Sequence, residues 1–134
     1  MKKHRIIEQE LVQVKEEQTL VDGFPGDVQR VLLYLHDHLF EESCNVNAIL
    51  ECSGATSPSI RARFKYHVGM KIHGYLTDQR MRAVIRLLRH NTLEIYVIAF
   101  SVGYANYRTF DRAFKRCVGC TPTAYREKMS RENV

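Results

Sequence analysis

The chain has 134 residues, enough for one ordinary domain with its own hydrophobic core, and its 20 Lys and Arg outnumber its 15 Asp and Glu. The charge is uneven, because residues 1–53 carry 5 basic and 10 acidic side chains whereas residues 54–134 carry 15 and 5. No apolar stretch follows the basic N-terminus or approaches the roughly 20 residues that cross a bilayer, so we expect a cytoplasmic protein without a secretory signal or membrane span.

The first 26 residues are predicted to be an N-terminal segment or linker. Residues 6–20 favour a short helix with Ile7, Leu11 and Val14 on one side. Residues 22–26 then collect two glycines and a proline, which are typical of a turn. The main domain is therefore expected to cover residues 27–130.

Two helices and a capped turn are predicted to open this domain. Residues 27–40 repeat apolar side chains at the spacing of one helix face, namely Val28, Val31, Leu32, Leu35 and Leu39. Asn45 can cap a short helix that runs to Cys52, and Gly54 can end it.

A second capped helix follows this turn directly. Thr56 is predicted to cap a helix that begins at Ser57, has Pro58 in its first turn and runs to Gly69.

The second half repeats this order after one longer helix. Residues 72–90 predict a helix with inward Ile72, Leu76, Val84, Leu87 and Leu88, and with Arg80, Arg82, Arg86 and Arg89 between them. A short helix over 93–102 is expected to end at Gly103, and Asn106 to cap a helix over 107–117. Thr121 and Pro122 then begin a last helix. No segment alternates with period two, so the fold class is all-α.

A repeated phrase supports a duplicated unit. Phe-Lys-x-x-Val-Gly occurs at residues 64–69 and again at 114–119, a spacing of 50 residues. Each copy ends a basic helix that follows a short helix and a glycine turn. This order is typical of a helix-turn-helix, whose second helix can enter the major groove of DNA. We predict one helix-turn-helix at about 45–68 and another at about 93–117.

The predicted DNA contacts lie on the second helix of each unit, where Ile60, Phe64, Phe110 and Phe114 would face the core. Arginine matches the acceptors of guanine, and basic side chains and helix N-termini bind phosphates. The candidate base contacts are Pro58, Ser59, Arg61, Ala62, Tyr107, Arg108, Asp111 and Arg112. The candidate phosphate contacts are Thr56, Lys65, Asn106, Thr109 and Lys115.

The same residues carry a family resemblance. The stretch Gly103-Tyr104-x2-Tyr107-x2-Phe110-x3-Phe114-Lys115-x3-Gly119-x-Thr121-Pro122-x2-Tyr125-Arg126 resembles the signature of the AraC/XylS-type transcription regulators. Ile98-Ala99 and Tyr75-Leu76-x3-Arg80-Met81 extend the resemblance, which covers residues 27–128. It implies a bacterial regulator of transcription with a seven-helix domain, in which a long helix over 72–90 joins two helix-turn-helix subdomains. The implied partners are double-stranded DNA, bound by a domain able to act as a monomer, and RNA polymerase.

The first copy departs from the family pattern at three positions. Leu50 follows Ile49 where members carry a small residue, Ala55 replaces a larger apolar residue, and Ala62 stands where arginine is common. The second copy keeps Ala99. We therefore predict that the second helix-turn-helix carries more of the sequence specificity.

Other function classes find less support in the sequence. The basic helices could instead bind an acidic protein, and this interaction module is the main alternative. No phosphate-binding glycine loop or Gly-x-Ser-x-Gly occurs, and the histidines have no partnered cysteine or carboxylate arrangement, so we expect no enzyme activity and no cofactor.

One cysteine pair has the spacing of metal ligands. Cys117 and Cys120 could join Cys44 and Cys52 in a zinc or thiol-switch site. A helix end at Gly119 and a helix start at Thr121 explain the same stretch, and cysteine is commonly buried as a small hydrophobe. We therefore favour a structural role and predict no metal site.

Overall fold

A computed structural model describes residues 2–18 and 21–132, and this part of the chain folds into eight α-helices without a strand. The helices are α1 (Lys2–Glu16), α2 (Gly26–Asp37), α3 (Val46–Cys52), α4 (Ile60–Val68), α5 (Ile72–Leu88), α6 (Ile95–Ser101), α7 (Tyr107–Val118) and α8 (Pro122–Glu132). The all-α prediction is confirmed, and α2 to α8 are the seven helices expected after residue 26. None of the described helices is long and apolar enough to cross a membrane.

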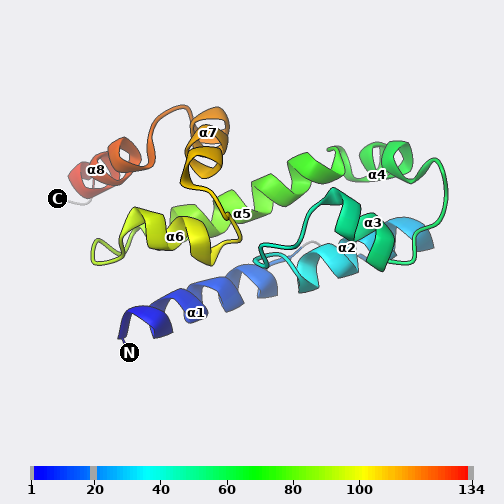
Figure 1. Ribbon diagram of the computed structural model, residues 1–134, viewed down its shortest axis with the longest axis horizontal. Helices are drawn as coiled ribbons and strands as arrows, with labels where there is room; N and C mark the ends of the chain where they lie inside the picture. The colour runs from blue at the N-terminus through cyan, green and yellow to red at the C-terminus, as the bar shows by residue number, and fades with distance from the viewer. Residues whose placement is uncertain (1, 19–20, 133–134) are drawn as a thin grey trace.

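The long helix α5 lies between two similar groups of helices (Figure 1). At one end α2 packs on α3 and α4, and at the other α7 packs on α6 and α8. Both α4 and α7 also contact α5. Each group therefore contains one helix-turn-helix, α3–α4 and α6–α7, and α5 joins them as predicted.

Several helix ends follow from local chemistry. The Asn45 side chain accepts a hydrogen bond from the Ala48 amide at 2.9 Å, and Thr121 Oγ1 caps α8 through the Ala124 amide at 3.0 Å. Gly69 and Gly119 end α4 and α7 with φ of 91° and 93°, a left-handed conformation that other residues rarely adopt. These predicted caps and ends are confirmed.

The predicted start of the fourth helix is wrong. Thr56 does not cap it and Ser57 does not begin it, because α4 starts at Ile60 and the residues before it form a turn. The Ile60 amide donates to the Ser57 carbonyl at 3.1 Å, and the Ser59 amide donates to Ser57 Oγ at 3.3 Å. Because the Ser57 side chain closes this turn, Pro58 lies in the turn and α4 is three residues shorter than α7.

Smaller shifts occur at three other helices. The helix expected over 27–40 ends at Asp37, although Leu39 is still fully buried in the following turn. The helices expected over 72–90 and 93–102 end one or two residues earlier, at Leu88 and Ser101. The apolar pattern therefore predicts burial more accurately than it predicts the last helical turn.

The repeated phenylalanines are anchors of the core, as predicted. Phe64 and Phe114 are fully buried, and each meets a tyrosine edge-on with ring centroids 5.9 Å apart. The partners are Tyr75 and Tyr125, which are themselves 50 residues apart. The duplication thus extends from the sequence to the packing of each second helix.

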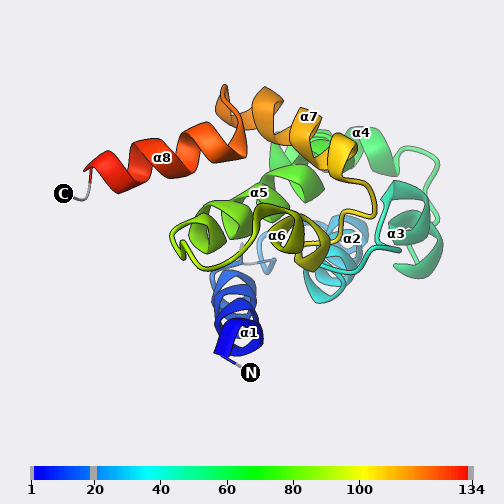
Figure 2. The same cartoon turned by 60° about the vertical axis from the view of Figure 1, so that its left-hand side comes forward.

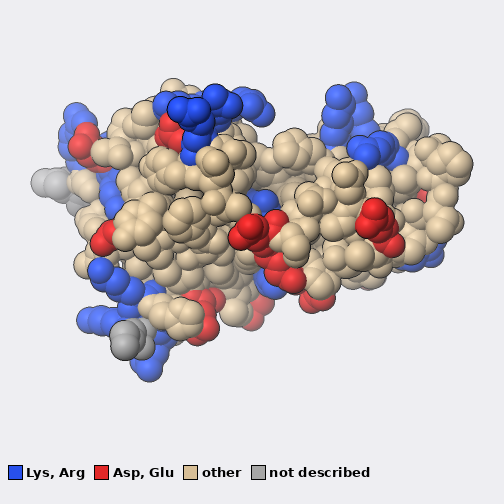
Figure 3. All heavy atoms as spheres, viewed as in Figure 1, with Lys and Arg blue, Asp and Glu red and all other residues tan. Residues whose placement is uncertain are grey.

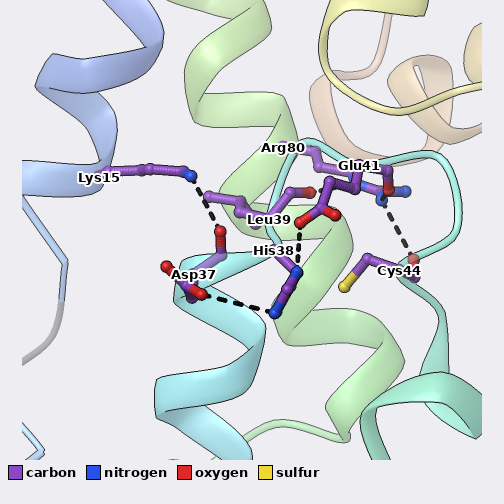
Figure 4. A network of polar contacts seen from close by, with 7 residues as sticks. All are labelled: Lys15, Asp37, His38, Leu39, Glu41, Cys44 and Arg80. Atoms are coloured by element: carbon purple, nitrogen blue, oxygen red, sulfur yellow. Dashed lines mark hydrogen bonds and ion pairs between the residues drawn. The ribbon is translucent and has the colours of Figure 1, made fainter. Parts of the chain in front are cut away.

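Arg80 is buried, whereas the sequence pattern placed it with the arginines between the inward positions. Its side chain is 7% exposed and donates hydrogen bonds to the carbonyls of Leu39 at 2.9 Å, Glu41 at 2.8 Å and Cys44 at 3.1 Å (Figure 4). These carbonyls belong to the loop between α2 and α3. The guanidinium, which has five donors, supplies the hydrogen bonds that this irregular backbone lacks.

Arg126 plays the same part in the other group of helices. It donates to the carbonyls of Leu88 at 3.0 Å, His90 at 3.1 Å and Leu93 at 2.7 Å. These carbonyls lie where α5 ends and the chain turns toward α6. A guanidinium therefore fixes the loop that precedes the short helix of each helix-turn-helix.

The N-terminal segment contains a helix that starts earlier than the predicted 6–20 and packs on α5. Ile7 and Val14 are buried, and Leu11 packs against the core. Glu10 and Glu17 each lie 3.4 Å from Arg86 of α5. Residues 19 and 20, the end of the predicted helix, lie outside the described residues. The helix α1 covers the side of α5 that faces away from α4 and α7 (Figure 2).

Candidate nucleic-acid interface

The second helices of the two helix-turn-helix units lie on the same side of the molecule. Figures 1 and 2 both place α4 and α7 above α5 and α1 below it. Lys and Arg atoms project from this upper edge over α7 and over α4 (Figure 3). A single ligand on this side of the molecule could therefore contact both helices.

The helix α7 divides cleanly into a buried and an exposed face. Phe110 and Phe114 are fully buried, whereas Tyr107, Arg108 and Arg112 are exposed. Among the described residues, no ion pair or side-chain hydrogen bond engages Arg108 or Arg112. Both guanidinium groups are therefore available to a ligand, as the predicted base contacts require.

The start of α7 is fixed by Asn106. Its side-chain oxygen accepts hydrogen bonds from the amides of Arg108 at 2.8 Å and Thr109 at 3.2 Å. This cap holds the first turn of the helix, from which the Arg108 and Thr109 side chains extend into solvent. The exposed Asn106 amide nitrogen remains free to donate to a phosphate.

Asp111 and Lys115 bind each other instead of standing apart. Lys115 Nζ lies 2.9 Å from an Asp111 carboxylate oxygen, one helical turn away. Burial, and then the Asp111 charge, raise the pKa of the Tyr107 hydroxyl, so this phenol keeps its proton near neutral pH. The predicted base contact Asp111 therefore neutralises the predicted phosphate contact Lys115 in the unbound protein.

The corresponding surface of the first unit offers fewer long side chains. Thr56, Pro58 and Ser59 are exposed but precede α4 instead of lying on its first turns. On α4 itself, Arg61, Ala62 and Lys65 are exposed, and Ile60 and Phe64 are buried as predicted. Arg61 is thus the one arginine of this helix that no described residue engages.

Arg63 is held by an ion pair that the sequence did not indicate. Its Nε and Nη2 donate to the two carboxylate oxygens of Asp27 at 2.8 and 3.2 Å, which lowers the pKa of Asp27. This pair connects α4 to the first turn of α2, 36 residues earlier. Position 113 of the second copy is alanine, so the repeat itself carries no signal for such a pair.

The two short helices differ where the family pattern predicts a difference. In α6, Ile98 and the following Ala99 are both fully buried. In α3, Ile49 is fully buried but Leu50 is only partly so. The larger Leu50 side chain thus lies at the margin of the core, where the second copy buries a methyl group.

Residues 2–18 and 21–132 contain no cluster of side chains that could hold a metal ion. No three His, Cys, Asp or Glu side chains gather there as a metal site would require. Cys44 is buried and Cys117 exposed, and the four cysteines are free thiols. Burial raises the pKa of the Cys44 thiol, which favours the protonated form that binds metals poorly.

Comparison with known proteins identifies a family model, sequence relatives and a solved structure that are similar to this chain. A family model described as a helix-turn-helix domain matches residues 49–128. The F1 operon positive regulatory protein of Yersinia pestis is 31% identical over 74% of the chain, and the arabinose operon regulatory protein of Escherichia coli is 23% identical over 74%. The C-terminal domain of AraT, a response regulator from Geobacillus stearothermophilus, superposes with a TM-score of 0.72 at 27% identity, covering 78% of this chain and 87% of that one.

The matched region is one part of the relatives. The chain covers 33% of the Yersinia pestis protein and 34% of the Escherichia coli protein. The family model nevertheless runs from within α3, through α4, the joining helix α5, α6 and α7, into α8. The chain belongs to the AraC/XylS-type family of helix-turn-helix transcription regulators.

Proposed function

We propose that this chain binds specific double-stranded DNA by placing α4 and α7 in successive major-groove segments, and that it thereby regulates transcription. Domains of this family bind DNA, and the relatives are regulators and not enzymes, as the sequence predicts. The observation that carries the proposal is the pair of free arginines, Arg108 and Arg112, on the exposed face of α7.

The candidate contacts fall into two groups, side chains that can contact bases and side chains that can contact phosphates. Arg61, Arg108 and Arg112 can each donate two hydrogen bonds to guanine, and Tyr107 can donate its phenolic proton to a base or a phosphate. We expect Thr109, Asn106 and Lys65 to contact phosphates beside the two recognition helices. Asp111 can accept from cytosine once Lys115 turns to a phosphate. The turn residues Thr56, Pro58 and Ser59 would then lie against the edge of the groove.

The length of α5 bears on the shape of the bound DNA. Its 17 residues span about 26 Å, whereas successive major-groove segments on one face are about 34 Å apart. Because α5 sets the separation of the two subdomains, we expect the DNA to bend toward the protein. Part of the specificity would then come from the deformability of the sequence between the two contacts.

The protein needs no second copy for this binding mode, since one chain carries both recognition helices. We therefore propose binding as a monomer at a two-part site on the bacterial nucleoid, with RNA polymerase as a further partner. A gel-filtration measurement of the complex with one duplex would test the stoichiometry.

The decisive experiment selects binding sequences from random duplex DNA with the purified protein. The enriched duplex and a scrambled version are then titrated with wild type, Arg108→Ala, Arg61→Ala and the control Arg5→Ala, which removes one charge from α1. Truncating a base-contacting arginine should cost about 1–3 kcal/mol for the enriched duplex. We expect the larger loss for Arg108→Ala and none for Arg5→Ala.

Two results would contradict the proposal. Equal binding to the enriched and scrambled duplexes would favour the alternative, a module that binds acidic partners through its charge. A larger loss of affinity for Arg61→Ala than for Arg108→Ala would mean that α4, and not α7, contributes more to base recognition.

A further inference from the structure

A pocket lined by basic side chains lies where α4 ends and α5 begins. Arg61, Ala62 and Lys65 of α4 line it together with Lys71, Ile72 and His73. We call Lys65, Lys71 and His73 the basic pocket. All three side chains are exposed, and no described residue forms an ion pair with any of them. The charges of the two lysines and the N–H donors of all three side chains are therefore accessible from solvent.

The pocket at the corresponding turn of the second unit has a different lining. It is formed by Val118, Gly119, Cys120, Ala124, Lys128, Arg131 and Glu132. Fifty residues after the members of the basic pocket stand Lys115, Thr121 and Thr123. Lys115 is neutralised by Asp111 at 2.9 Å, and the Thr121 hydroxyl caps α8. The three positions of the basic pocket therefore carry basic side chains that no described residue pairs, whereas the matching positions of the second unit carry one paired lysine and two threonines. Arg116, in the last turn of α7, is exposed but has tyrosine as its counterpart in α4.

The exposed face of α4 carries fewer side chains that could contact bases than the exposed face of α7. The hydroxyls of Ser57 and Ser59 lie 3.0 Å apart and engage each other in the turn, and Ala62 offers only a methyl group. The Arg63 guanidinium is turned away to Asp27. Arg61 is the one remaining long polar side chain before Lys65, whereas α7 presents Arg108 and Arg112.

We propose that the two subdomains divide the work: the first holds the DNA mainly by its phosphodiester backbone through the basic pocket, and the second reads the bases. The inference rests on the proposed function and goes beyond it by assigning Lys71 and His73 to the interface. The lysine ammonium groups and the His73 imidazole donate to phosphate oxygens. Such contacts release counterions and are independent of base sequence.

The test compares two double variants that lose the same charge. Lys65→Ala/Lys71→Ala empties the basic pocket, and Lys2→Ala/Lys3→Ala removes two exposed lysines from α1, on the opposite side. Each protein is titrated with the selected duplex and with its scrambled version between 50 and 200 mM salt. Circular dichroism verifies folding, which exposed and unpaired lysines should not affect.

Losing two phosphate contacts should reduce the slope of log affinity against log salt by about 1.8. The affinity lost by the pocket variant should consequently be about tenfold smaller at 200 mM than at 50 mM salt. The loss should be the same factor for both duplexes. Lys65→Arg/Lys71→Arg should restore the wild-type slope, and the α1 variant should retain it.

An unchanged slope would overturn the inference, and so would a loss confined to the selected duplex. Failure of the proposed function looks different, because wild type would then not distinguish the two duplexes. In that case the slope measured on scrambled DNA still tests the basic pocket. Absence of any DNA binding by wild type would overturn both.

Discussion

Replacing Arg80 with methionine should be among the most destabilising single changes in this protein. The guanidinium is 7% exposed and donates to three loop carbonyls, which methionine would leave without partners. Each hydrogen bond from a charged donor contributes about 1.5–3 kcal/mol. Burial lowers the pKa of Arg80, so removing the charge also relieves a desolvation cost of several kcal/mol. We expect a net loss of about 3–5 kcal/mol in the free energy of unfolding.

The assay is urea unfolding followed by circular dichroism, with Arg82→Met as the matched control on the same helix. Arg82 is exposed and pairs only with Asp78, one turn away at 3.3 Å. Its replacement should change the free energy of unfolding by no more than about 0.5 kcal/mol. If Arg80→Met lies within about 1 kcal/mol of this control, then the three hydrogen bonds do not hold the loop before α3.

Three further changes test other parts of the fold. Gly103→Ala should lower the melting temperature more than Gly119→Ala. Both glycines have positive φ, but a Cβ at Gly103 would lie 2.7 Å from Arg80 Nη2, and equal effects on the melting temperature would exclude that close contact. Burial lowers the pKa of His36 to about 4, below its unfolded value of about 6.5, so the folded state loses stability as pH falls between these values. The effect of this pKa shift on stability is discounted because His36 is partly exposed. Between about pH 7 and pH 4 the free energy of unfolding of wild type should fall by about 1–2 kcal/mol more than that of His36→Gln, and equal falls would refute the role of His36. Asn106→Ala should cost about 1 kcal/mol of stability, whereas Asn106→Asp, which keeps the cap, should cost less in the same urea titration.

The parts of the fold that could be predicted from sequence are those set by neighbouring residues. Asn45, Asn106 and Thr121 cap helices because a short polar side chain reaches only the next two or three amides. Gly69 and Gly119 end helices because their backbone is left-handed. The apolar spacing likewise predicted that Phe64 and Phe114 lie in the core, because helical periodicity shows which side chains lie on the apolar face of each helix.

The parts that could not be predicted depend on partners distant in the chain. Helical spacing already separates Arg80 from Arg82, because Arg80 follows Leu76 by four residues and precedes Val84 by four, on the inward face of α5. What could not be predicted is its hydrogen-bond partners, the carbonyls of the loop before α3. Arg63 is taken from the exposed face of α4 by Asp27 in the same way. The start of α4 was predicted wrongly for a different reason. Thr56 was expected to cap a helix beginning at Ser57, but the Ser57 side chain closes a turn before the helix begins at Ile60.

The two buried guanidinium groups show that the duplication of the structure is deeper than the repeat in the sequence. Arg80 and Arg126 are 46 residues apart, not 50, and come from different turns of α5 and α8. Each guanidinium nevertheless donates hydrogen bonds to three backbone carbonyls where the chain leads into a short helix. In the second subdomain the short helix α6 packs on α7, whereas in the first α3 packs on α2, and α4 packs on α2 and α5. Because α5 supplies Arg80, provides the Leu88 carbonyl to Arg126 and contacts both α4 and α7, this one helix positions the two subdomains.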